Sequence, residues 1–365
     1  MKKSFTMNSF ALSIALLSAF APERVVAQES TTSIDARLQQ MMKKFPKADA
    51  DGDGVLTESE ARAYKKSAKN TNVIDTKESD RTKASEPTHA DVSYGPHERN
   101  SLDFWRASSD SPSPVFIFFH GGAFKGGDKA MLKDRPILEE CLAAGISVVS
   151  VNYRFSSDAA FPAPMHDGAR AVQYVRSKSK EWNVDPDRIA LSGSSAGATL
   201  ALWITLHDDL ADPGSQDPIP RLSTRVTCAS PHSGTAGLEP EYFQKHTGVT
   251  ELGPALWQLF GARSQIEFAS EAKRPLLREA SPLLHATSDD PPLFLTYAGD
   301  PSETPFASDA QQKAWIHHVS LGLPLKEKYE SLGRECELYH HANPAKNGEE
   351  IAFLKKHLLR EAKKQ

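Results

Sequence analysis

Short apolar, β-branched runs alternate with longer segments of helical periodicity along the chain from residue 90 onward. Continuous apolar runs of this length, bounded by polar or turn residues, are typical of strands that are buried on both faces. Strands are predicted at residues 115–120, 146–153, 189–192, 226–229, 293–298 and 336–340. Helices are predicted at residues 131–144, 167–182 and 326–332. The alternation predicts an α/β fold, in which a doubly wound, mostly parallel sheet carries helices on both faces.

A different pattern occupies the first 27 residues. A basic start at residues 1–3 is followed by an apolar stretch at 10–21 and by small residues that end at Ala27. This order is typical of a secretory signal peptide. The apolar stretch is shorter than the roughly 20 residues that span a bilayer. We expect cleavage after Ala27 and a soluble, secreted or periplasmic protein without membrane contact, and retention as an N-terminal anchor is the alternative.

Alternating acidic residues mark a second unit at residues 34–69. Residues 49–60 read DADGDGVLTESE, which matches the calcium loop D-x-D-x-D-G with Glu at its twelfth position. Calcium prefers several hard oxygen ligands. The predicted ligands are Asp49, Asp51 and Asp53, the carbonyl of Val55, Thr57 directly or through water, and bidentate Glu60. The alternative is a capping box between Thr57 and Glu60. The segment resembles an EF-hand, so calcium is the expected cofactor, and the polar residues 70–89 are expected to form a linker.

A G-x-S-x-G pattern lies between the predicted strand at 189–192 and a helix-forming run at 198–206. A serine placed between a strand and a helix in this way is the nucleophile-elbow pattern. Gly193 and Gly197 lack Cβ atoms, so strand and helix can approach closely while the serine stands in a strained turn. Ser195 is therefore the predicted nucleophile. A small-residue turn that merely starts a helix is the alternative.

The sequence FFHGGAF at residues 118–124 ends another predicted strand. An acyl-transfer nucleophile needs hydrogen-bond donors aimed at the oxyanion of the tetrahedral intermediate. A His-Gly-Gly turn exposes backbone amides for that task. The predicted donors are the amide of Gly122 or Ala123, together with the amide of Ala196 directly after the nucleophile. His120 is expected to hold this loop by a hydrogen bond rather than to react.

These motifs occur in a fixed order with Tyr94-Gly95-Pro96-His97, the VNYR sequence at 151–154, Phe161-Pro162 and His166-Asp167. Together they resemble the α/β-hydrolase fold, in the carboxylesterase group related to hormone-sensitive lipases and to bacterial feruloyl and acetyl esterases. The resemblance covers residues 90–365 and implies a Ser–acid–His triad in that chain order.

The resemblance implies that the acid of the triad follows a late strand of the sheet and that the histidine base follows the last strand. It points to Asp300 in the Gly-Asp-Pro turn, with Glu303 and Asp309 as substitutes. For the base it points to His341, and His340 comes second. The family's usual His-Gly is missing here, and the histidine pair at residues 317–318 is a further candidate.

Composition narrows the function further. The net charge of −4 argues against a nucleic-acid-binding protein, and the three cysteines lack the spacing of a zinc or disulfide framework. We expect a secreted serine carboxylesterase that needs no cofactor for catalysis and acts on a small-molecule or polysaccharide ester. The alternative is a catalytically impaired hydrolase fold that serves as a calcium-dependent binding or scaffolding protein. The long stretch 208–291 is expected to be a lid or substrate-binding insertion, or helices packed on the sheet.

Overall fold

The computed structural model describes residues 38, 48–50, 55–57, 60–61, 85–303 and 315–359. The chain divides into two units, Met1–Thr82 and Lys83–Gln365. The larger unit contains the sheet and the helices that cover it. Within the described residues, no helix is long and apolar enough to cross a bilayer.

An eight-stranded sheet lies at the centre of the larger unit, in the order β1-β2-β4-β3-β5-β6-β7-β8. The strands are β1 (His89–Ser93), β2 (Ser101–Trp105), β3 (Ser113–Phe119), β4 (Ser147–Val151), β5 (Val184–Ser194), β6 (Cys228–His232), β7 (Leu293–Thr296) and β8 (Cys336–Tyr339). From β4 to β8 all neighbours pair in parallel, whereas β1 and β2 pair antiparallel at one edge. The predicted mostly parallel sheet is confirmed.

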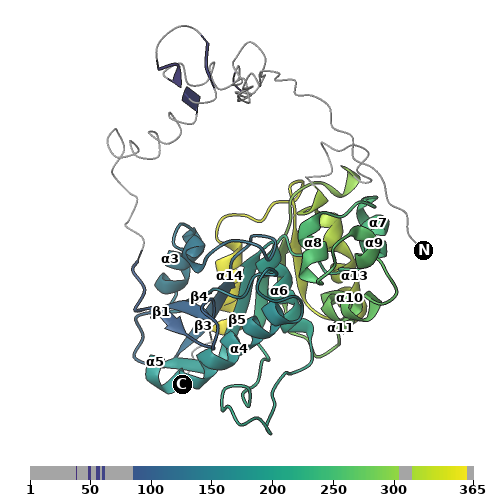
Figure 1. The fold of residues 1–365 in the computed structure, drawn as a ribbon. Helices are drawn as coiled ribbons and strands as arrows, with labels where there is room; N and C mark the ends of the chain where they lie inside the picture. Colours follow the sequence, from purple (N-terminus) through teal and green to yellow (C-terminus); the bar gives the residue numbers. More distant parts are fainter. Residues whose placement is uncertain are drawn as a thin grey trace, which may run out of the picture. The chain divides into compact units, whose positions relative to one another are not determined.

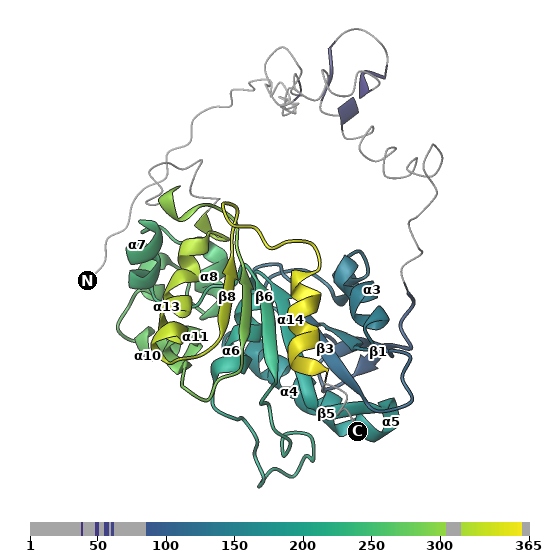
Figure 2. The same ribbon diagram turned by 180° about the vertical axis from the view of Figure 1, so that it is seen from behind.

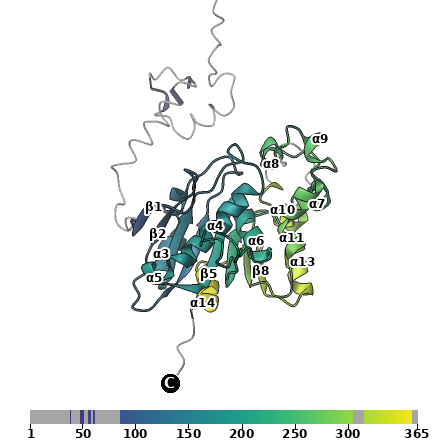
Figure 3. The same ribbon diagram turned by 60° about the horizontal axis from the view of Figure 1, so that its bottom comes forward.

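Helices cover both faces of this sheet, as Figures 1 and 2 show from opposite sides. The helices are η2 (Lys129–Leu132), α3 (Pro136–Ala143), α4 (Ala163–Ser177), α5 (Ser179–Trp182), α6 (Ala196–Leu206), α7 (Pro240–Thr247), α8 (Pro254–Leu259), α9 (Gln265–Phe268), α10 (Arg274–Ala280), α11 (Pro282–His285), η3 (Pro301–Glu303), η4 (Val319–Leu321), α13 (Leu323–Ser331) and α14 (Glu349–Leu358). Helices α7 to α11 gather with α13 beyond the β8 end of the sheet (Figure 3).

Strand β3 shows why the sheet is apolar throughout. All seven of its residues are buried. Val115, Ile117 and Phe119 pack in the core beneath α4 and α6, whereas Phe116 and Phe118 pack in the core shared with α3 and α14. Successive side chains of a strand point to opposite faces, so a strand covered on both sides carries a continuous apolar run.

The described residues of the smaller unit contain a buried cluster of Leu38, Ala48, Leu56 and Ala61. Thr57 and Glu60 form a reciprocal capping box: the Thr57 amide donates to Glu60 Oε2 at 2.9 Å, and the Glu60 amide donates to Thr57 Oγ1 at 3.2 Å.

The remainder of the predicted EF-hand is not described. The predicted ligands Asp51 and Asp53 lie outside the described residues, as do residues 1–27, so the EF-hand and the signal peptide stay predictions.

Candidate active site

Ser195 lies at the sharp turn where β5 ends and α6 begins. Its backbone has φ 54° and ψ −116°, a strained conformation for a residue other than glycine. The Ser195 amide donates to the carbonyl of His232 on β6 at 2.9 Å, and the Ser195 carbonyl accepts from Thr199 of α6 at 3.0 Å. The neighbouring strand and the helix therefore hold the strained turn in place.

The two glycines of the motif permit this turn by close approach. A Cβ atom on Gly197 would lie 2.1 Å from the carbonyl oxygen of Phe119, at the end of β3. A Cβ atom on Gly193 would lie 2.4 Å from the carbonyl carbon of Gly197. Both distances are shorter than real Cβ contacts, so the start of α6 can lie against the end of the sheet only with glycine at these positions.

The loop after β3 carries two of the predicted oxyanion donors, and one of them, Ala123, lines a cavity together with Ser195. Gly122, Ala123 and Phe124 have φ of 126°, 55° and 56°, an unusual run of positive values. Among the hydrogen bonds of the described residues, none is donated by the amides of Gly122 or Ala123. Ala196 is the first residue of α6, where the helix has no internal acceptor for its amide. Ala123, Ala196 and Ser195 all line one cavity.

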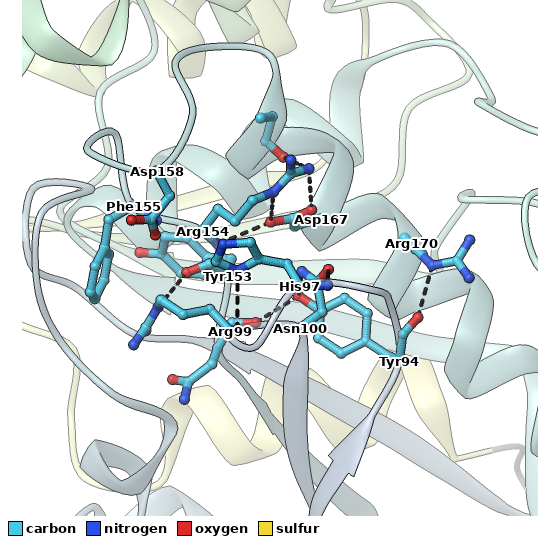
Figure 4. Close-up of polar contacts among 12 residues, drawn as sticks. Tyr94, His97, Arg99, Asn100, Tyr153, Arg154, Phe155, Asp158, Asp167 and Arg170 are labelled. Carbon is cyan, nitrogen blue, oxygen red and sulfur yellow. Dashed lines mark hydrogen bonds and ion pairs between the residues drawn. The ribbon is translucent and has the colours of Figure 1, made fainter.

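His120, directly after β3, stabilises this loop by hydrogen bonds. Its Nε2 lies 3.1 Å from Arg99 Nη2, and its Nδ1 lies 2.8 Å from the carbonyl oxygen of Gly121. Because a guanidinium only donates, Nε2 must accept and Nδ1 must carry the proton. Burial lowers the pKa of His120 to about 4, which keeps the ring neutral. Arg99 also donates to the Tyr153 carbonyl at 2.8 Å (Figure 4).

An ion pair between Arg154 and Asp167 supports the segment that follows β4. Arg154 Nε and Nη2 donate to the two carboxylate oxygens of Asp167 at 2.8 and 2.6 Å (Figure 4). The Arg154 amide donates to the same carboxylate at 2.9 Å. Because Asp167 is buried on α4, this bidentate pair fixes the loop to the helix that packs beside α6.

The imidazole beside the nucleophile belongs to His317. Its Nε2 lies 2.9 Å from Ser195 Oγ. His317 lies between β7 and β8, just before η4, and its carbonyl accepts from the amide of Ala298 at 2.9 Å. Burial lowers the pKa of His317 below its usual 6.5, which favours the neutral imidazole that can accept a proton.

The structure brings His317, the further candidate, to Ser195 and does not bring His341 there. The His341 amide donates to the Gly299 carbonyl at 3.1 Å, and its side chain is exposed. Two backbone hydrogen bonds between His340 and Asn343 turn the chain away after β8. His340 and His341 line a separate cavity. The signal in the sequence was the missing His-Gly combined with the histidine pair between the last two strands.

The predicted acid Asp300 also lies away from the reacting pair. Its Oδ1 accepts from the amide and the hydroxyl of Ser302, both at 2.9 Å, and these hydrogen bonds lower the pKa of Asp300. Its backbone carbonyl lies 3.0 Å from Nε2 of His318. The structure thus places Asp300 next to the neighbour of His317 rather than next to His317 itself.

Of the two substitutes for this acid, Glu303 contacts His318 and not His317. Glu303 Oε2 lies 3.6 Å from His318 Nε2. Asp309 lies outside the described residues. Buried His318 also places its Nδ1 2.7 Å from Ser320 Oγ. The hydrogen bonds of the His318 ring therefore hold the backbone next to His317 in place.

The cavity in front of Ser195 has a volume of about 120 Å³ and mostly apolar walls. The walls come from α7, α8, the residues before η4 and η4 itself: Phe243, Leu256, Leu259, Trp315, Ile316 and Leu321. An apolar cavity of roughly 150 Å³ takes up a benzene molecule, so this space suits a short acyl chain. The long insertion after α6 thus supplies part of the cavity wall.

The strand order, the serine at a strained elbow and the imidazole on its hydroxyl define an α/β-hydrolase with a serine-centred site. The chain belongs to the BD-FAE family, because the family's model matches residues 102–307, more than half of its 365 residues.

Relatives and solved structures agree with this assignment. The esterase LipQ of Mycobacterium tuberculosis is 30% identical over 231 residues, which are 62% of this chain and 51% of LipQ. The probable carboxylic ester hydrolase LipM of the same organism is 30% identical over 219 residues, 59% of this chain and 48% of LipM. The chain thus spans about half the length of these relatives.

Two solved structures share the fold. The acetyl ester-xyloside bifunctional hydrolase from Caldicellulosiruptor lactoaceticus aligns with a TM-score of 0.53 at 25% identity, over 67% of this chain and 78% of that protein. A truncated carbohydrate esterase from gut microbiota aligns with a TM-score of 0.60 at 18% identity, over 77% of this chain and 99% of that protein.

Proposed function

We propose that the protein is a serine carboxylesterase, and the contact of 2.9 Å between Ser195 Oγ and His317 Nε2 carries the proposal. Ser195 attacks the ester carbonyl carbon while His317 Nε2 takes the hydroxyl proton. The amides of Ala196 and of Gly122 or Ala123 accommodate the oxyanion of the tetrahedral intermediate. His317 then returns the proton to the leaving alcohol.

Water then hydrolyses the acyl-enzyme, and His317 again acts first as a base and then as an acid. His317 takes a proton from water, the resulting hydroxide attacks the acyl carbon, and the bond to Ser195 Oγ breaks as His317 returns the proton. The lowered pKa of His317 keeps it neutral and ready to accept. Its orientation comes from the backbone bond to Ala298 and from its anchored neighbour His318. In this proposal Asp300 helps to position His317 indirectly, because its backbone carbonyl accepts a hydrogen bond from His318.

The substrate that fits is an ester of a short acyl group, because the cavity at Ser195 is small and apolar. The bifunctional hydrolase from Caldicellulosiruptor lactoaceticus carries acetyl ester in its name, which supports an acetyl group for this chain. Together with the predicted signal peptide, this favours deacylation of extracellular polysaccharide by a secreted or periplasmic enzyme.

The test compares p-nitrophenyl acetate with p-nitrophenyl octanoate, and wild type with Ser195→Ala. We expect the acetate to be preferred, and the variant to lose hydrolysis and labelling by a fluorophosphonate probe. Ser194→Ala is the matched control, since its serine lies in the same motif and should leave both readouts intact. Equal rates for wild type and Ser195→Ala refute the esterase. Absent labelling favours the catalytically impaired binding protein instead.

We further propose that residues 49–60 bind calcium. Glu60, at the twelfth position, reaches across the loop, and its Oε1 accepts from the amide of Ala50 at 3.0 Å. The oxygens of Asp49, Thr57 and Glu60 are hard ligands that suit calcium. Calorimetric titration of the full chain with Ca²⁺ should give heat that Glu60→Gln removes. No heat for the wild type leaves the capping box as the role of Thr57 and Glu60.

A further inference from the structure

A cluster of two histidines and a glutamate lies at the far end of α6 from Ser195. His207 follows the last residue of α6, Glu279 belongs to α10 and His285 ends α11. One ligand atom from each residue lies within 4.8 Å of the other two. We propose that these three side chains bind a divalent transition metal of the zinc type.

The ligand set has the chemistry that zinc requires. Two imidazoles and one carboxylate, with a water in the fourth position, form a common tetrahedral zinc site. Zinc binds these atoms at roughly 2.0–2.2 Å, which places tetrahedral ligands about 3.3 Å apart. Because the three atoms already lie within 4.8 Å, small side-chain rotations close the site. Imidazole ligands favour such a metal over calcium or magnesium, which prefer oxygen.

Both imidazoles are oriented by backbone carbonyls, as metal-bound histidines usually are. His207 Nδ1 lies 3.0 Å from the carbonyl oxygen of Asp208. His285 Nε2 lies 2.7 Å from the carbonyl oxygen of Glu279. In each ring one nitrogen therefore has an acceptor for its proton, which leaves the other nitrogen to bind the metal: Nε2 in His207 and Nδ1 in His285.

Both ring nitrogens of His207 lie next to oxygen atoms. Its Nε2 lies 2.8 Å from Glu279 Oε1, so both ring nitrogens face oxygen acceptors. A neutral imidazole has one N–H and satisfies only one of them. A cation between His207 Nε2 and the carboxylate would satisfy both of them while Nδ1–H donates to the Asp208 carbonyl. The adjacent ring of His285, at a centroid distance of 4.6 Å, brings a third ligand-bearing side chain to the same place.

Trp203 makes this arrangement rigid. Its Nε1 donates to the Glu279 carbonyl at 2.8 Å, the same oxygen that faces His285. Its ring lies 4.5 Å from that of His207. A metal here would join the end of the nucleophile helix to α10 and α11, so binding should raise the temperature of unfolding.

The experiment is calorimetric titration of the full, tag-free chain with Zn²⁺, in excess Ca²⁺ to occupy the oxygen ligands of residues 49–60. We expect one Zn²⁺ to bind at this cluster and to raise the unfolding temperature. Glu279→Gln and His285→Asn should each lower the affinity by at least the roughly 10- to 100-fold that loss of an outer-shell partner costs. His341→Asn removes an exposed histidine elsewhere and should bind as wild type does.

Circular dichroism verifies that each variant is folded, and Glu279→Gln is the conservative one because the half-exposed side chain keeps its shape. The proposal is overturned if the wild type binds no Zn²⁺, or if both variants bind it as tightly as the wild type. The readout needs no ester hydrolysis, so this result is independent of the proposed esterase activity.

Discussion

Replacing His317 with asparagine removes the imidazole that lies 2.9 Å from Ser195 Oγ while retaining a polar side chain. Loss of a positioned general base typically costs roughly 100- to 10,000-fold, which is about 2.7–5.4 kcal/mol of transition-state stabilisation. We expect kcat/KM on p-nitrophenyl acetate to fall within that range. Most of the fall should be in kcat, because His317 contacts the nucleophile and not the acyl cavity wall.

His341→Asn is the decisive comparison, because a base after the last strand is the arrangement that the sequence resemblance implies. The His341 side chain is exposed and its backbone is bonded to Gly299, so kcat/KM should stay near the wild-type value. Initial rates and the rate of fluorophosphonate labelling should give the same order: wild type and His341→Asn similar, and His317→Asn much slower. Retained activity in His317→Asn together with lost activity in His341→Asn would refute the placement of the base.

Three further outcomes follow from the same geometry. The acidic limb of the kcat/KM profile should have its midpoint below pH 6.5, because burial lowers the pKa of His317 and only the neutral ring accepts a proton; a midpoint above 6.5 contradicts this. Asp300→Asn should cost far less than the roughly 10⁴-fold typical of an orienting aspartate, as measured by kcat, since its carboxylate bonds to Ser302. Gly197→Ala should lower stability by at least about 1–3 kcal/mol in thermal unfolding, whereas Gly126→Ala, with open space around the added Cβ, should not.

The central sheet could be predicted because burial on both faces leaves a local trace in the sequence. The strand at 115–120 is a run of apolar residues that needs no knowledge of its partners. The two antiparallel strands escaped prediction, and the edge strand β1 shows one reason: four of its five residues are exposed, so its apolar pattern is faint. The predicted helix 131–144 is divided because Pro136 begins α3 and lacks the amide that a continuous helix needs.

The active site was predictable only where the chemistry is local. Ser195 and its glycines lie within five residues, and the steric demand of the turn fixes their identity. Which histidine lies next to Ser195 depends on which distant loop reaches the serine. That in turn depends on how the chain turns after β7 and after β8. The turn between His340 and Asn343 and the bridge between Ala298 and His318 decide it, and neither has a sequence pattern of its own.

The segment from Trp315 to Leu321 carries both the imidazole next to Ser195 Oγ and part of the cavity wall. Under the proposed mechanism, acyl selectivity and proton transfer therefore depend on the same segment. A substitution that widens the cavity at Ile316 acts on the residue adjacent to His317, so a broader substrate range would come with a slower chemical step. Redesign for larger acyl groups should begin on α8, where Leu256 and Leu259 border the same space without touching the imidazole's support.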